Sequence, residues 1–260
     1  MSKLTDKLEE ASHGTSQPLG FAVGARREKA PPVLLLASVA SGASAEMKLV
    51  VDAGLDGAFL TGEGTKSALD KAAKALGEVP WGTWVTEAQA EPPKGSDFQV
   101  FSSDLTPLAA LGGKNRTQVM QVSPELDDSL LRTIEDLPVD AFLVSLADAE
   151  AMTVHQLMRV ARVRSVTSKW LFVHLASLPV KEEVERLHEC GVSAVVVDAA
   201  GKSAADFKAL RAAILELPAE PPKRRHDRRS ATIPSLGMPG GGQGRPAPEP
   251  EPDEDDYDDE

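Results

Sequence analysis

The stretch CGVSAVVVD, residues 190–198, joins the end of a helix to a short strand, and its pattern returns throughout the chain. Gly191 suits the left-handed conformation in which many helices end, and the aliphatic run after it is typical of a strand buried on both faces. Eight apolar runs of this kind can be counted, most of them followed by a helical stretch. They span residues 33–38, 57–61, 81–86, 97–102, 117–122, 140–145, 169–174 and 194–198.

Eight strands that alternate with helices predict a single α/β domain of the (β/α)8 type, the TIM barrel. The helical stretches support this fold because their apolar residues recur with the 3.6-residue period, as at Phe207, Leu210 and Ile214. Their opposite faces are charged, so each helix is expected to cover the sheet on one side and to face water on the other. An open, doubly wound α/β sheet is the alternative arrangement of the same elements.

The chain divides into three segments by composition. Residues 1–32 form an N-terminal helix and a lead-in, with a short amphipathic helix predicted over 3–12 and a Gly- and Pro-rich remainder that covers the bottom or one side of the barrel. Residues 33–217 form the barrel. Residues 218–260 are rich in Pro and Gly, first basic and then acidic, and they hold too little apolar surface to offset the entropy of ordering. We therefore predict a disordered tail.

Charge and composition exclude several classes of function. The 260 residues carry 40 acidic and 28 basic side chains, a net charge of −12, which argues against nucleic acid as a partner because phosphates are bound by clustered Lys and Arg. No apolar run reaches the roughly 18 residues that a membrane span needs, so no membrane is expected. Cys190 is the single cysteine, which precludes an internal disulfide. With no secretory signal at the N-terminus, we expect a cytoplasmic protein.

A short motif recurs where helices lead into strands. It consists of a turn residue, a spacer, a small polar residue, Ala or Gly, and an aliphatic run, as in residues 52–60 (DAGLDGAFL), 190–198 and, without the glycine, 137–144 (LPVDAFLV). Over residues 33–217 this pattern resembles the aldolase-type barrels, the ribulose-phosphate-binding and flavin-linked superfamily, without matching one family in it. The resemblance implies a ligand site at the carboxyl ends of the strands.

The carboxyl ends of the predicted strands carry hydroxyls and carboxylates around one histidine. Glu63, Glu87, His174 and Asp198 are the candidate catalytic residues, since two of them within hydrogen-bond reach could act as general acid and base. The alternative is that they belong to the solvated polar rim that every barrel has.

The loop after the last strand is the candidate phosphate site. In phosphate-binding barrels the anion lies between the loops after strands seven and eight, at a helix N-terminus. Here Gly201 permits close approach of the backbone, Lys202 supplies charge and Ser203 can donate a hydrogen bond. The loop at 175–179 lacks the glycines that usually complete such a site, so a plain capped helix start explains the residues equally well.

Other chemistries have weaker support. No two histidines stand at ligand spacing, so no metal is predicted. No strand carries an internal lysine, which argues against a Schiff-base aldolase. A flavin would also need glycines and a strand-borne Lys or Arg that the sequence lacks, and the cofactor stays undetermined.

Two functions follow from these patterns. The first is binding of a small phosphorylated or carboxylated metabolite at the carboxyl face of the barrel, with catalysis left open. The second is a non-catalytic barrel that serves as a binding or scaffold module, with the charged tail contacting a protein partner. A concave site where at least two candidate residues converge would favour the enzyme.

Overall fold

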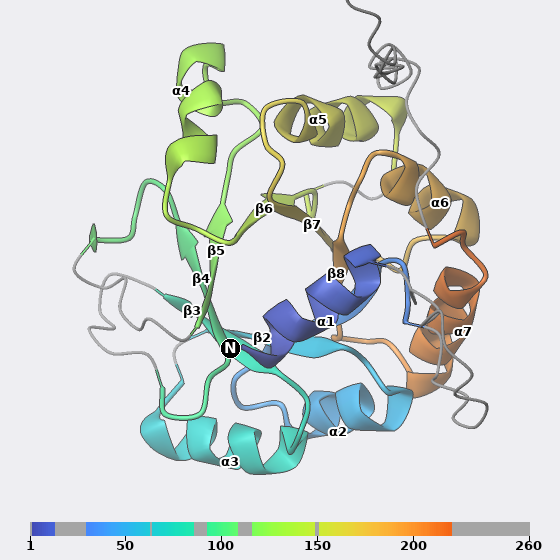
Figure 1. Ribbon diagram of the computed structural model, residues 1–260. Helices are drawn as coiled ribbons and strands as arrows, with labels where there is room; N and C mark the ends of the chain where they lie inside the picture. Colours follow the sequence, from blue (N-terminus) through green and yellow to red (C-terminus); the bar gives the residue numbers. More distant parts are fainter. Residues whose placement is uncertain are drawn as a thin grey trace, which may run out of the picture. The chain divides into compact units, whose positions relative to one another are not determined.

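The computed structural model describes residues 2–13, 30–62, 64–85, 93–108, 116–148 and 151–219. These residues form a closed barrel of eight parallel strands (Figure 1). The strands are β1 (Leu34–Ala40), β2 (Gly57–Thr61), β3 (Trp81–Val85), β4 (Phe98–Ser102), β5 (Thr117–Gln121), β6 (Ala141–Ser145), β7 (Trp170–Leu175) and β8 (Ala194–Asp198). The helices are α1 (Lys3–His13), α2 (Ser44–Ala53), α3 (Lys66–Leu76), α4 (Asp128–Thr133), α5 (Val154–Arg164), α6 (Lys181–Glu189) and α7 (Ala204–Leu215), with a short 3-10 helix, η2 (Ile134–Asp136), after α4.

The predicted TIM barrel is confirmed. Strand β1 pairs in parallel with both β2 and β8, in a register that sets Leu34 opposite Ala194 and Ser38 opposite Asp198. This last pairing closes the sheet, so the open doubly wound alternative was wrong. Each observed strand begins and ends within two residues of its predicted bounds.

Alternate residues of each strand point to opposite sides of the sheet and fill two separate apolar layers. Side chains that point outward, such as Leu35 and Val195, form one buried cluster with the surrounding helices. Side chains that point inward form a second cluster along the barrel axis. It includes Phe59 and Phe98, whose ring centroids are 4.9 Å apart, and Phe172, 6.4 Å from Phe59. The interior is therefore packed and leaves no pore through the barrel.

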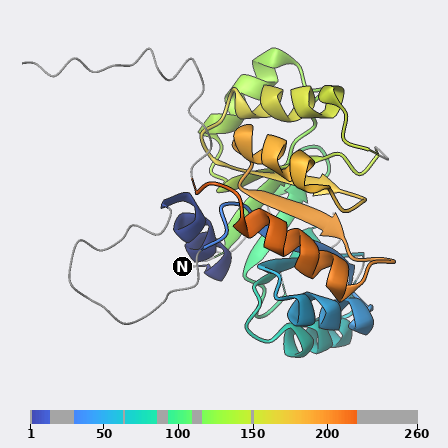
Figure 2. The same ribbon diagram turned by 90° about the vertical axis from the view of Figure 1, so that its right-hand side faces the viewer.

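Helix α1 closes the end of the barrel where the strands begin (Figure 2). Its residues Leu4 and Leu8 are buried among the inward-pointing side chains of the strands. The carboxylate of Asp97, directly before β4, accepts hydrogen bonds from the backbone N–H groups of Lys3 and Leu4 at 2.7 and 2.8 Å. The helix predicted over residues 3–12 is confirmed. Most of the lead-in after it lies outside the described residues.

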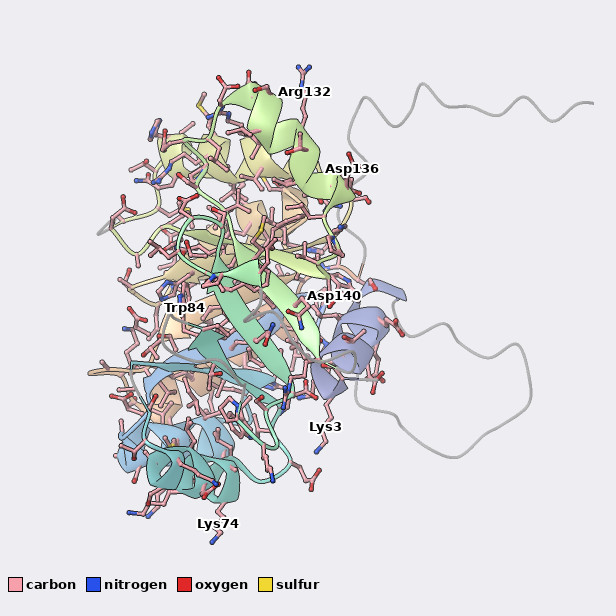
Figure 3. All side chains as sticks on the ribbon, turned by 90° about the vertical axis from the view of Figure 1, so that its left-hand side faces the viewer. Lys3, Lys74, Trp84, Arg132, Asp136 and Asp140 are labelled. Atoms are coloured by element: carbon pink, nitrogen blue, oxygen red, sulfur yellow. The ribbon has the colours of Figure 1, made fainter. Side chains whose placement is uncertain are left out.

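Helices cover the barrel unevenly. Of the described residues, those between β3 and β4 and those between β4 and β5 contain no α-helix, whereas each later strand is followed by one. Figure 3 shows the strands of this sector between α3 and α4. The predicted disorder of residues 218–260 concerns a segment that, beyond Ala219, lies outside the described part of the chain.

Candidate functional site

A ring of eight side chains lies at the carboxyl end of the barrel interior. Each lies at or near the carboxyl end of its strand and points inward in the period-two pattern, and each is half-buried while the inward position directly before it is buried. We call this set the mouth ring. It consists of Ser38, Thr61, Trp84, Ser102, Gln121, Ser145, His174 and Asp198.

His174 and Asp198 are joined within the mouth ring. The Nε2 atom of His174 lies 2.8 Å from Oδ1 of Asp198, with the two side chains 18% and 35% exposed. The residues come from adjacent strands, β7 and β8, whose register places His174 opposite Val196, one inward position below Asp198. Two of the four candidate catalytic residues are therefore in hydrogen-bond contact, and both reach solvent.

Ser145 extends this contact to a third strand. Its Oγ lies 3.4 Å from Nδ1 of His174, opposite which it stands in the β6–β7 register. The sequence pattern placed Ser145 at a strand end but gave it no role. Its signal was the alternation of β6, which points Ala141, Leu143 and Ser145 to the same side of the sheet.

Glu63 and Glu87 lie outside the described residues. In the sequence Glu63 follows β2 and Glu87 follows β3, so both belong to connections that leave the carboxyl ends of strands. Their proposed acid and base roles stay predictions.

The predicted phosphate loop is held by its own side chains. Lys202 is half-buried, and its Nζ donates to the carbonyl of Ala176 at 2.7 Å, which joins the loops after β7 and β8. Ser203 caps α7: its backbone N–H and its hydroxyl donate to the Asp206 carboxylate at 3.0 and 2.7 Å. These hydrogen bonds hold the pKa of Asp206 below its usual range. Gly201 has φ +72°, a conformation that glycine adopts readily.

A cavity of about 310 Å³ opens beside the mouth ring, at the carboxyl ends of β4, β5 and β6. Ser102, Gln121 and Ser145 line it from the ring, with Ser123 and Arg159 beyond them. The Arg159 guanidinium lies between two carboxylates, with Nε 3.0 Å from Oε1 of Glu125 and Nη1 3.7 Å from Oδ2 of Asp148. The cavity is therefore polar and large enough for a small metabolite.

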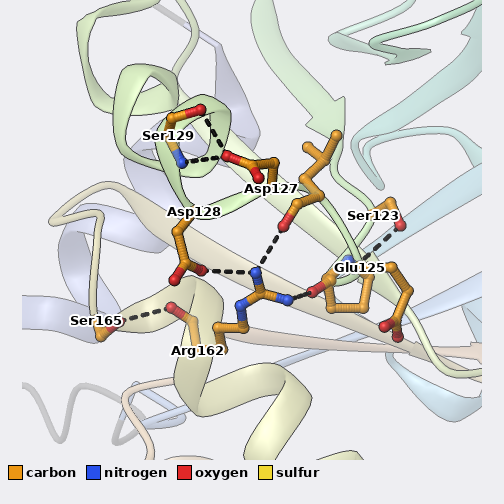
Figure 4. A network of polar contacts seen from close by, with 9 residues as sticks. Ser123, Glu125, Asp127, Asp128, Ser129, Arg162 and Ser165 are labelled. Carbon is orange, nitrogen blue, oxygen red and sulfur yellow. Dashed lines mark hydrogen bonds and ion pairs between the residues drawn. The ribbon is translucent and has the colours of Figure 1, made fainter.

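An arginine of α5 fixes the wall of this mouth cavity. Arg162 donates to the carbonyls of Pro124 and Leu126, each at 2.6 Å, and contacts Asp128 at 2.7 Å (Figure 4). These bonds hold the loop between β5 and α4 against α5. Because Ser123 and Pro124 line the cavity, the fork of one guanidinium determines the position of that wall.

The described part of the chain contains neither a metal-ligand cluster nor a membrane-spanning helix. No group of three or more His, Cys, Asp or Glu side chains in it is arranged to hold a metal ion. No helix in the described ranges is long and apolar enough to cross a bilayer.

Comparison with known proteins identifies the fold. No family model and no curated protein matches the sequence. Tryptophan synthase subunit alpha from Legionella pneumophila matches with a TM-score of 0.54 and 15% identity, over 84% of this chain and 100% of that chain. Thiamine phosphate pyrophosphorylase from Pyrococcus furiosus gives 0.52 and 12%, over 70% and 95%. KGPDC from Streptococcus mutans gives 0.52 and 11%, over 68% and 96%. These likenesses show the aldolase-type barrel fold that the junction motif indicated.

Proposed function

We propose that this barrel is an enzyme acting on a small phosphorylated or carboxylated metabolite at the mouth ring, with His174 as its general acid and base. The observation that carries the proposal is the 2.8 Å contact between His174 Nε2 and Asp198 Oδ1. A carboxylate that holds one ring nitrogen orients the imidazole and leaves the other nitrogen free to exchange a proton.

The anionic group of the metabolite is assigned to the loops after β7 and β8. Of Gly201, Lys202 and Ser203, the proposal relies on Lys202, since the Asp206 carboxylate already takes the donors of Ser203. Lys202 spans both loops through its bond to Ala176, which is where phosphate lies in phosphate-binding barrels. One of the similar barrels, thiamine phosphate pyrophosphorylase, has a phosphorylated compound in its name.

The metabolite class is tested by thermal unfolding with three probes: inorganic phosphate, D-ribose 5-phosphate and succinate. A ligand that binds the folded state alone raises its stability, by about 2.7 kcal/mol at a hundredfold excess over Kd. At least one probe should raise the Tm of the full chain, and Lys202→Met should remove most of that shift. Unphosphorylated D-ribose is the negative control.

The matched control is Lys208→Met, which removes an exposed lysine from α7, the helix that follows the loop. It should keep the full shift. The proposal is wrong if none of the three anions changes the Tm, or if Lys202→Met and Lys208→Met behave alike.

One cysteine and no internal disulfide suit the cytoplasmic location that we propose for this activity.

A second function, docking of a partner protein, is favoured by a groove on the outer face of β4 and β5. The groove holds about 570 Å³ and lies in the sector where the described residues contain no covering helix. Its floor includes Phe101 and Met120, and its walls include Leu130 and Leu108, which are 56% and 85% exposed. Apolar surface of this kind marks interaction sites.

The charges around the groove indicate its occupant. Asp104 lines it, and Glu135 and Asp136 belong to η2, whose first residue, Ile134, also lines it. Hydrogen bonds from Ser168 and Thr167 hold the pKa of Glu135 below its usual range, so this carboxylate stays charged. We propose that the groove binds an amphipathic helix with a basic polar face. The charged tail, which lies outside the described residues, stays a second proposed contact for partners.

A labelled 18-residue probe peptide with Leu at helical i, i+3, i+4 and i+7 spacing tests this surface by fluorescence anisotropy. A version with Lys on its polar face should bind, and a version with Glu there should not. Leu130→Glu should abolish binding, whereas Met158→Glu, on an exposed apolar residue of α5, should not. Equal binding of both peptides, or a dimer that Leu130→Glu dissociates, would contradict the proposed occupant.

A further inference from the structure

Three side chains at the ends of the adjacent strands β6, β7 and β8 form a chain of two polar contacts. Ser145 Oγ lies 3.4 Å from His174 Nδ1, and His174 Nε2 lies 2.8 Å from Asp198 Oδ1. We propose that Ser145 is a catalytic nucleophile, activated by His174 for acyl transfer from a small anionic ester. The proposal rests on the proposed function and adds to it the reaction class and the residue that bonds to substrate.

Asp198 decides which nitrogen of the imidazole acts as base. A carboxylate only accepts hydrogen bonds, so His174 carries its proton on Nε2 and donates it to Asp198. Nδ1 then holds a lone pair and accepts the hydroxyl proton of Ser145. These are the roles of a Ser-His-Asp triad with the two ring nitrogens exchanged. The Ser145 contact is long, as contacts between nucleophile and base often are before substrate binds.

Ser145 also has space in front of it. It lines the 310 Å³ mouth cavity together with Gln121 and Ser102, while His174 contacts it from the neighbouring strand. A nucleophile needs its base on one side and its substrate on the other, and this arrangement provides both. The Gln121 side chain lines the same cavity, and its amide N–H groups are the donors assigned to the oxyanion.

The reaction balances with water as the only co-reactant. The Ser145 oxygen forms a bond to the carbonyl carbon of the ester while its proton passes to His174 Nδ1. The bond between that carbon and the alkoxy oxygen then breaks, and the proton on Nδ1 passes to the leaving alcohol. Water, deprotonated by Nδ1, attacks the acyl-serine, which releases a carboxylic acid and returns the proton to Ser145.

The mouth ring supplies a matched control for this serine. Ser38 is also inward-pointing and half-buried, and it stands opposite Asp198 in the β1–β8 register. No hydrogen bond between Ser38 and His174 is found among the described residues. If mere location in the mouth ring made a serine reactive, Ser38 and Ser145 would react alike.

The test is covalent labelling of the full chain by an alkyl fluorophosphonate. The probe reacts with an activated serine through formation of an Oγ–P bond and loss of fluoride, and it needs no knowledge of the natural substrate. Intact mass should rise by one adduct, which peptide mapping should place on Ser145. Ser145→Ala should abolish labelling, and peptide mapping of the wild type should find Ser38 unmodified.

Variants of the partners separate a triad from a merely exposed hydroxyl. His174→Gln and Asp198→Asn should each slow labelling by at least about a hundredfold, with unchanged circular dichroism as the check on folding. An unlabelled wild-type chain, or an adduct that survives Ser145→Ala, would overturn the proposal. If the probe labels Ser145 but no anion shifts the Tm, the proposed nucleophile stands and the proposed metabolite class is wrong. If an anion shifts the Tm but the probe does not label the chain, the metabolite class stands and the nucleophile is wrong.

Discussion

His188 is a buried titratable side chain that joins α6 to the segment after α7. It lies on α6 with 4% of its surface exposed, and its Nε2–H donates to the carbonyl of Pro218 at 3.0 Å. Burial lowers the pKa of this imidazole, and the nearby Glu189 and Glu185 offset only part of that effect. The folded protein therefore favours neutral His188.

A pH dependence of stability follows from His188. Because its pKa is lower in the folded state than in the unfolded chain, the unfolded chain binds the extra proton first. The stabilisation is complete above the unfolded pKa of about 6.5 and is lost as the pH falls through that value toward the folded pKa. Urea unfolding between pH 8 and pH 5 should show a steeper loss of free energy for the wild type than for His188→Gln. Parallel curves for the two proteins would contradict this assignment.

At the scale of elements, the residues that lead into strands do more than end a turn. The sequence motif includes a small polar residue before each aliphatic run. In the structure that residue accepts a hydrogen bond from the first part of the preceding strand: Asp56 from Leu35 N at 2.9 Å, and Asp140 from Gln118 N at 2.7 Å. The motif therefore adds a hydrogen bond between neighbouring strands at the floor of the barrel, which explains why it recurs.

Helix α1 should contribute to the stability of the whole barrel. Leu8 is 1% exposed and packs among the inward-pointing side chains, so Leu8→Ala leaves a cavity at the floor. We expect a loss of about 2–5 kcal/mol in the free energy of unfolding, measured by urea denaturation. Glu10→Ala, on an exposed position of the same helix, should change it by less than about 0.5 kcal/mol. Equal effects would mean that α1 does not fill the floor.

The elements were predictable and the site only in part, for one physical reason. A strand that is buried on both faces consists almost wholly of apolar residues, so its bounds can be predicted from the sequence, as for Ala194–Asp198. The contact of Ser145 with His174, and of His174 with Asp198, depends on the stagger between strands. In the β6–β7 pairing Ser145 stands opposite His174, whereas in the β7–β8 pairing His174 stands opposite Val196. A single sequence does not contain this offset.

At the scale of the whole molecule, the last buried side chain and the last hydrogen-bonded carbonyl lie beside the boundary predicted at residue 217. Leu217 is 3% exposed, and Pro218 accepts the bond from His188. A chain that ends at Pro222 should unfold at the same temperature as the full chain, because the polar residues after it have little apolar surface to bury. A chain that ends at Glu216 should unfold at a lower temperature. Equal melting temperatures for all three, by calorimetry, would place the boundary earlier.

The closed floor has a consequence for the proposed enzyme. With α1 beneath the strands and Phe59, Phe98 and Phe172 packed along the axis, the described residues leave the barrel interior open to solvent at the mouth ring alone. Whatever enters must leave by the same route, so a product still seated there excludes the next substrate. Inhibition by product should accordingly be competitive, and the slowest step of a reaction at this site can be an exit rather than a bond cleavage.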